Sequence, residues 1–232
     1  MNVRRFAPII ACTALALASC APRVPEPVAP PPDAPEGFPA GDYARAAEAG
    51  EPVYRVDRER SLIVARVYRD GALARLGHDH VVSSRDLGGF VMLAADGAAD
   101  RADVYLPLAS LEVDDPALRA TEGLGEPLDE DDVAGTRRNM LRVLDADAHP
   151  FVMVHVTREG HIIKATLELN GESRALDARI EAETGDDILR ASGAFTIEHA
   201  DFGLVPFSLL GGALAVREDI DIRFDIVAVR AQ

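Results

Sequence analysis

The segment that decides the fold spans residues 219–228 and reads Asp-Ile-Asp-Ile-Arg-Phe-Asp-Ile-Val-Ala. Apolar and charged side chains alternate along it, and in an extended strand successive side chains point to opposite faces. The alternation therefore predicts a strand with one face on a core and the other in water. The same alternation recurs in segments 163–169, 176–183 and 189–198.

Shorter apolar runs add four candidate strands, at 61–68, 87–95, 103–108 and 151–157. Dipeptides that favour turns separate the candidate strands. They are Asp70-Gly71, Asp96-Gly97, Glu159-Gly160, Asn170-Gly171 and Gly185-Asp186. About eight amphipathic strands at close spacing predict an all-β fold, in which an antiparallel sheet is curled into a barrel or folded as a sandwich.

One α-helix is expected to interrupt the strands, within residues 131–144. Val133, Met140 and Leu144 recur there at near-helical spacing, after an acidic start that suits the positive end of the helix dipole. The acidic stretch 122–132 before it predicts a solvated loop, with an acidic metal site as the alternative.

The composition is that of a folded acidic protein. Lys and Arg number 24 against 39 Asp and Glu, which gives a net charge of −15 in 232 residues. Such a surface repels the phosphate backbone of nucleic acids, so nucleic-acid binding is excluded as a function. Aromatic residues make up only 5% and Trp is absent, so the interior must be built from Leu, Ile, Val and Ala.

The first 19 residues are interpreted as a lipoprotein signal peptide. Two basic residues, Arg4 and Arg5, precede the apolar run 6–17, and the sequence Leu-Ala-Ser-Cys that ends at Cys20 resembles a lipobox. The apolar run is too short for a helix that spans a bilayer. We predict a lipid anchor on Cys20, with an ordinary signal peptide cleaved nearby as the alternative. Ala21 follows the anchor in place of Asp, which by resemblance to enteric sorting rules favours the outer membrane.

Residues 20–41 are interpreted as the lipidated Cys and a tether. Eight prolines fall within 21–39, and they forbid a helix and favour extended polyproline II. A proline-rich recognition motif is the alternative. A short helix is expected at 42–50.

The inward positions of the predicted strands alternate large residues with very small ones. A barrel of about eight strands is just wide enough for large side chains to fill it, or for one ligand to replace them. Small residues at those positions predict an elongated apolar cavity, with close sheet-to-sheet packing as the alternative. The candidate lining residues are Ala165, Leu167, Leu176, Ala178, Ile180, Ala191, Gly193, Phe195, Ile222 and Phe224.

Four motifs in order resemble the YceI-like family. The first combines Tyr-Arg-Val-Asp at 54–57 with Ser-Leu-Ile-Val at 61–64, and the second runs from Arg-Asn-Met at 138–140 to His-Pro-Phe at 149–151. The third is Leu-Glu-Leu-Asn-Gly at 167–171, and the fourth includes Asp-Phe-Gly at 201–203.

The resemblance covers residues 53–229, which is effectively the whole domain. It implies an extended, lipocalin-like antiparallel barrel that binds polyisoprenoid or other long-chain lipids. The sequence departs from the family motifs at two places. His199 stands where the family usually has an Arg, and the polar stretch 77–80 replaces a less polar one. Both departures bear on the polar end of the ligand that the resemblance implies.

His78 and His80 are two residues apart, so on a strand both imidazoles would share one face. A metal site would need a third ligand, for which His149, His155 and His199 are candidates. The alternatives are a hydrogen-bonded structural cluster, or hydrogen bonds from the imidazoles to a carbonyl of a ligand such as a quinone. Motifs of hydrolytic metal centres and nucleophilic triads are missing from the sequence, so we do not expect an enzyme.

Three functions are compatible with these features. The first is an envelope lipoprotein that binds a long-chain isoprenoid lipid, quinones included, requires no cofactor and meets the membrane only through its anchor. The second is a metal-binding or redox accessory protein that uses His78 and His80. The third is a structural envelope adaptor with a filled barrel.

We expect the substitution Cys20→Ala to release the protein from the membrane. The acyl chains on this residue would supply many buried methylenes at about 0.8 kcal/mol each, whereas the acidic body is repelled by anionic lipids. Membrane fractionation measures the effect. A Cys20→Ala variant that still sediments with outer membranes would refute the lipid anchor.

Overall fold

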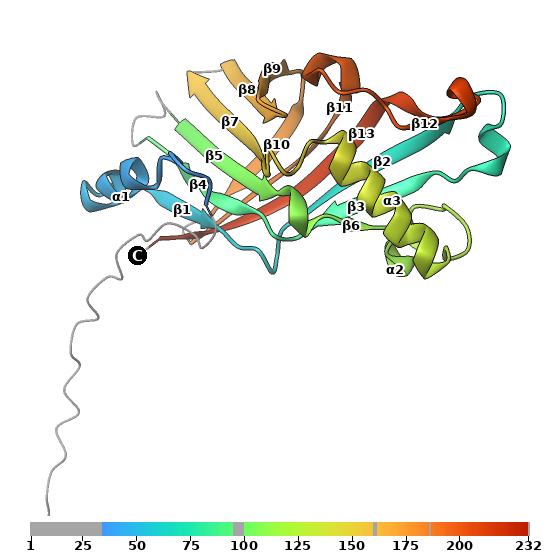
Figure 1. The fold of residues 1–232 in the computed structure, drawn as a ribbon. Coiled ribbons are helices and arrows are strands. Elements are labelled where there is room, and N and C mark those ends of the chain that lie inside the picture. Colours follow the sequence, from blue (N-terminus) through green and yellow to red (C-terminus); the bar gives the residue numbers. More distant parts are fainter. Residues whose placement is uncertain (1–33, 95–99, 160–161, 186, 232) are drawn as a thin grey trace, which may run out of the picture.

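The long C-terminal strand β13 (Leu214–Arg230) is the centre of the fold (Figure 1). In the computed structural model, which describes residues 34–94, 100–159, 162–185 and 187–231, one edge of β13 pairs with β11 (Ile188–Glu198). Its other edge pairs with β2 (Leu62–Asp70) and then with β1 (Val53–Val56). The signal peptide, Cys20 and most of the tether lie outside the described residues.

The remaining strands extend this sheet in two directions. From β1 the order continues through β4 (Gly88–Met92), β5 (Asp100–Pro107), β7 (Phe151–Glu159), β8 (Ile162–Leu169) and β9 (Glu172–Leu176). From β2 it continues through β3 (His80–Ser84) to β6 (Glu112–Val113). Two strands lie off this path: β10 (Arg179–Thr184) pairs with β11, and β12 (Ser208–Leu209) pairs with β13. Every pair is antiparallel, so the predicted antiparallel β architecture is confirmed.

The strands do not form the predicted closed barrel of eight strands. Thirteen strands make one sheet, and the ladder stops between β9, which pairs with β8, and β10, which pairs with β11. Short breaks separate successive strands, at 57–61, 85–87 and 177–178. At the first break the Ser61 hydroxyl bonds both the N–H and the carbonyl of Val227, at 3.1 and 3.2 Å. The Ser61 side chain therefore takes part in pairing with β13 there, beside the backbone bond from the Asp57 N–H to the Val227 carbonyl at 2.8 Å.

The helices also differ in part from the expectation. Helix α1 (Ala40–Glu48) and helix α3 (Glu130–Val143) lie where helices were predicted. Helix α2 (Pro116–Thr121) was not predicted, so the expectation of a single interrupting helix is wrong. Its start signal is present in the sequence, since Asp115 accepts a hydrogen bond from the Leu118 N–H at 2.8 Å and Pro116 opens the helix. None of the helices in the described residues is long and apolar enough to cross a membrane.

Helix α3 covers the side of the sheet where β3 and β5 diverge (Figure 1). Strand β4 pairs with β5, whereas β3 turns away to pair with the short β6. The apolar face of α3 packs over this gap. The partly buried residues that contact the core cluster around Leu106 and Leu111 are Val133, Met140 and Leu141 of α3 and its C-cap Leu144.

Two glycines should respond in opposite ways to substitution by Ala. A Cβ at Gly88 would lie 2.3 Å from the Tyr105 ring, and the buried ring has no room to move, so Gly88→Ala should cost about 1–3 kcal/mol. Gly135 lies inside α3, where a Cβ meets only the flexible end of Arg138 at 3.7 Å. Gly135→Ala should therefore stabilise the protein by about 0.5–1 kcal/mol. Urea unfolding measures both, and equal shifts in one direction would contradict this packing.

Candidate ligand-binding cavity

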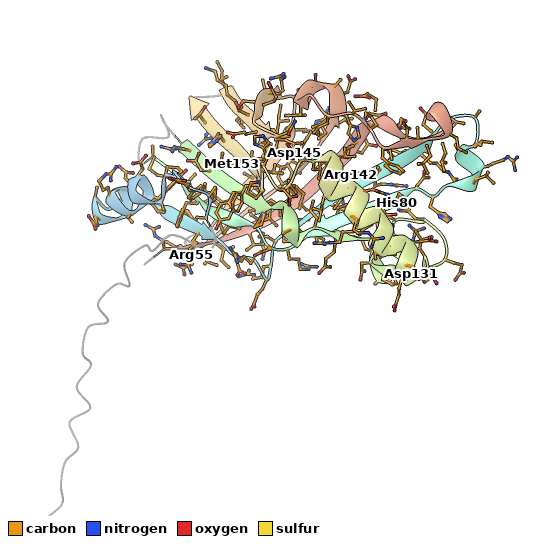
Figure 2. The ribbon with its side chains drawn as sticks, in the orientation of Figure 1. Arg55, His80, Asp131, Arg142, Asp145 and Met153 are labelled. Atoms are coloured by element: carbon orange, nitrogen blue, oxygen red, sulfur yellow. The ribbon has the colours of Figure 1, made fainter. Side chains whose placement is uncertain are left out.

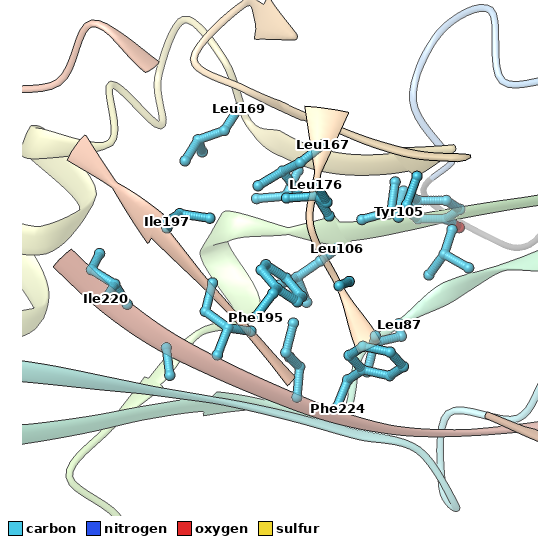
Figure 3. A pocket seen from close by; sticks show the side chains of 18 of the residues that line it. Leu87, Tyr105, Leu106, Leu167, Leu169, Leu176, Phe195, Ile197, Ile220 and Phe224 are labelled. Atoms are coloured by element: carbon cyan, nitrogen blue, oxygen red, sulfur yellow. The ribbon is translucent and has the colours of Figure 1, made fainter. Parts of the chain in front are cut away.

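The curved sheet encloses an elongated apolar cavity of about 530 Å³ (Figure 3). Its lining on β13 extends from Val216 to Ile226, a length of about 30 Å at the rise of a strand. The volume falls within the range of about 300–1,000 Å³ that is typical of sites for small molecules.

Most of the predicted lining residues lie where they were expected. Nine of the ten line the cavity, and they are Ala165, Leu167, Leu176, Ala178, Ile180, Ala191, Phe195, Ile222 and Phe224. Figure 3 shows the labelled members of this set, with Phe195 and Phe224 projecting inward from β11 and β13. The exception is Gly193, which pairs with Phe224 across the ladder and whose missing Cβ would lie 2.8 Å from that ring. The Phe224 ring therefore occupies the space above Gly193.

Other elements contribute lining residues that the prediction missed. Strand β7 contributes Val152, Val154 and Val156, and their strict alternation in the sequence could have placed them. Helix α3 contributes a stripe that sequence alone could not assign to the cavity. The stripe has the spacing of one helix face and consists of Thr136, Asn139, Met140 and Val143.

Two of the three predicted polar residues line the cavity. His80 lies at the start of β3 (Figure 2), and His199 begins the short 3-10 helix η3 (His199–Phe202) after β11. His78 is exposed in the loop before β3 and is not among the lining residues. The two histidines of the His-Asp-His stretch therefore do not share one face, because the strand begins only at His80.

A buried charge pair holds the His80 ring. Asp114 Oδ2 lies 2.6 Å from His80 Nδ1, and Asp114 Oδ1 accepts from Arg119 Nη1 at 2.6 Å and from the Val81 N–H at 3.1 Å. Arg119 also donates to the carbonyls of Asp79 and Leu124, at 3.0 and 2.7 Å. The cluster links β3, the residue after β6 and α2.

The same contacts keep Asp114 ionised. Burial acts to raise the pKa of its carboxyl, but the hydrogen bond from His80 and its Coulombic attraction, with the hydrogen bonds from Arg119 and the Val81 N–H, outweigh burial and hold the pKa below its ordinary value. Asp114 adopts a positive φ of 57°, which is uncommon for a residue with a side chain. The contacts of its carboxylate support this conformation.

The other candidate metal ligands have separate roles. His155 Nδ1 bonds Asp103, a buried carboxylate that also accepts from Tyr43 and Arg101, both at 2.6 Å. Burial, reinforced by Asp103, raises the pKa of the Tyr43 phenol well above its ordinary value. The His149 ring lies against Gly171. Within the described ranges, no three His, Cys, Asp or Glu side chains gather as a metal site would need.

The far end of the cavity carries a second ion pair. Asp100 accepts from Arg158 Nε at 2.7 Å and from the Ala94 N–H at 3.0 Å, and both charged side chains line the cavity. Because Asp100 and Arg158 satisfy each other, this end presents a neutral pair rather than a free charge.

A family model for the YceI-like domain matches residues 54–228. The chain belongs to the YceI-like family. The match covers almost the same residues as the domain at 53–229 predicted from the sequence. A comparison with curated proteins found no match.

One solved structure supports the fold of this YceI-like domain. Burkholderia cenocepacia BcnA superposes with a TM-score of 0.52 at 13% identity, over 74% of this chain and 98% of that chain. Two structures of a Campylobacter jejuni YceI protein, one of them a mutant, match with a TM-score of 0.41 at 19% identity, over 63% of this chain and 82% of theirs.

We expect Asp114→Asn to destabilise the YceI-like domain by about 3–5 kcal/mol, because it leaves the buried Arg119 charge without its partner. The folded-state pKa of Asp114 lies below its unfolded value of about 3.9. Its stabilisation is therefore present above pH 4 and lost as the pH falls through the folded-state pKa. Urea unfolding of the parent protein should show this acid loss, and Asp114→Asn should show less of it.

The matched control is Asp115→Asn, since Asp115 is exposed and Asn caps a helix about as well as Asp. An Asp114→Asn variant as stable as this control would contradict a supporting role for the charge pair.

Proposed function

We propose that this protein is an envelope lipoprotein that holds one long-chain isoprenoid lipid, quinones included, in the cavity, for carriage, storage or sensing. The family and the apolar, elongated cavity support a hydrophobic ligand. The apolar chain would lie along β13, and the polar head group would lie at one end of the cavity.

The observation that carries the proposal is that inward-facing apolar side chains are left partly exposed. Phe195, Ile222 and Phe224 face the interior of the sheet, yet none of them is fully buried. A packed protein interior leaves few voids larger than a water molecule. A filled barrel, as a purely structural adaptor would have, does not account for an apolar cavity of about 530 Å³.

Burial of an isoprenoid chain would supply the binding energy. Apolar surface removed from water contributes about 25 cal/mol per Å² on both ligand and protein. The lining residues are mainly Val, Leu, Ile, Ala and Phe from strands on all sides, which suits a chain without polar groups along its length.

The N-terminal sequence supports a proposal for the location of the protein. We propose that acylated Cys20 anchors it in the outer membrane and that the proline-rich stretch 20–41 holds the domain on the periplasmic side. A polyproline II segment extends about 3.1 Å per residue, so a tether of this length could reach about 60 Å from the membrane.

Extraction of the purified protein with organic solvent, followed by mass spectrometry, tests the proposed function directly. We expect close to one equivalent of an isoprenoid lipid per chain. A protein that releases no lipid, and takes up none when incubated with isoprenoids in detergent, would refute it.

We expect Ala191→Phe to lower the amount of copurified lipid severalfold. Ala191 lines the cavity on β11, so a phenyl group there would occupy space that the lipid needs. The matched control is Ala194→Phe, on the exposed outer face of the same strand. Lipid content by mass spectrometry and stability by urea unfolding are the measurements. If Ala191→Phe instead keeps its lipid, or costs the 1–3 kcal/mol or so that overpacking costs, the site is a packed core.

A further inference from the structure

The hydrogen bond between His80 and Asp114 determines which nitrogen of the imidazole carries the proton. Asp114 receives hydrogen bonds from Arg119 and from the Val81 N–H, and its side chain is fully buried beside that guanidinium. It is therefore an ionised carboxylate, which can only accept. The Nδ1 of His80, 2.6 Å from Oδ2, must be the donor.

A neutral imidazole with its proton on Nδ1 has a bare lone pair on Nε2. His80 lines the cavity from the same face of β3 as Val82, and its Nε2 has no partner within the described part of the chain. When the ring is neutral, Nε2 is therefore a hydrogen-bond acceptor that a donor on the ligand can satisfy.

His199 repeats this arrangement. Its Nδ1 lies 2.7 Å from the backbone carbonyl of Glu218, and a carbonyl can only accept, so Nδ1 again carries the proton. The His199 side chain is buried and lines the cavity. Its Nε2 is a second acceptor with no partner among the described residues.

The sheet register places both acceptors at the same end of the cavity. Glu198, just before His199, pairs with Asp219, while the neighbouring Ile220 pairs with Val67, which in turn pairs with His80. The two histidines thus lie at one level on either side of the β13–β2 pair. The opposite end holds the neutralised pair of Asp100 and Arg158.

We propose that His80 and His199 form a hydroxyl-recognition site, which selects an isoprenoid whose head group is an alcohol or a phenol, such as a quinol, over the corresponding carbonyl compound. This inference rests on the proposed function, because it assigns the polar end of the same ligand. It reverses the donor role that the sequence suggested for these imidazoles: the neutral rings accept, and a quinone carbonyl offers them no proton.

The cost of a mismatch makes the selection effective. A buried acceptor without a donor loses its hydrogen bond to water and gains none in return. An aldehyde or quinone oxygen would add a second bare acceptor beside the imidazoles, whereas a hydroxyl would satisfy one of them.

Two variants remove the acceptors and keep their supporting hydrogen bonds. In His80→Asn and His199→Asn the amide nitrogen stands near the former Nδ1 and donates to Asp114 or to the Glu218 carbonyl, but no atom remains at the position of Nε2. His78→Asn is the matched control, since His78 is exposed and outside the cavity lining.

The experiment measures the affinity of delipidated protein for geranylgeraniol and for geranylgeranial, which have the same chain and differ only in the donor hydroxyl. Titration calorimetry at pH 8 is suitable, because imidazoles are ordinarily neutral there. The parent protein and His78→Asn should bind the alcohol about tenfold more tightly than the aldehyde. The double variant His80→Asn/His199→Asn should bind both with equal affinity, and each single variant should lose part of the preference.

Equal binding of alcohol and aldehyde by the parent protein would overturn the hydroxyl-recognition site and leave the proposed function standing. A double variant that keeps the full preference would overturn it as well. If neither compound binds to the parent protein, the proposed function fails together with this inference. If the double variant does not fold, as judged by urea unfolding, the two single variants decide the question.

Discussion

The pairing of β13 along both of its edges is the interaction on which the rest of the structure depends. One edge is hydrogen-bonded to β11 from Glu198 to Ile188, and the other to β2 and then to β1. The strand therefore joins the two halves of the sheet, and its alternating side chains direct Ile220, Ile222 and Phe224 toward one interior. Without this strand, β2 and β11 would not belong to one sheet, and their apolar faces would not line the same interior.

A second constraint arises because the interior is larger than the side chains that point into it. The ladder around this space is interrupted, with a side-chain link at Ser61 and no pairing between β9 and β10. Helix α3 then covers the gap between β3 and β5. The cavity is thus a consequence of small residues on the strands and of a helix that covers a gap without filling the space beneath it.

The polar groups at the two ends of the cavity differ in whether all of their hydrogen-bonding atoms have partners. Asp100 is paired with Arg158, and Asp114 is paired with Arg119. The Asp114–Arg119 pair is buried at a cost that its hydrogen bonds must offset. The imidazoles of His80 and His199 are different, since Nδ1 of each is bound by the protein and Nε2 has no partner among the described residues.

The sequence by itself determined the antiparallel β architecture, the positions of α1 and α3, and nine positions that line the cavity among the ten that it proposed. It could do so because alternation and helical spacing are local properties that survive folding wherever one face is buried. It could not determine that Phe224 covers Gly193, that His78 stays outside while His80 turns inward, or that Asp114 is the partner of His80. Those facts depend on ladder register and on contacts between residues far apart in the chain, such as the 34 positions between His80 and Asp114, and only the tertiary structure brings such groups within the 3 Å or so that a hydrogen bond requires.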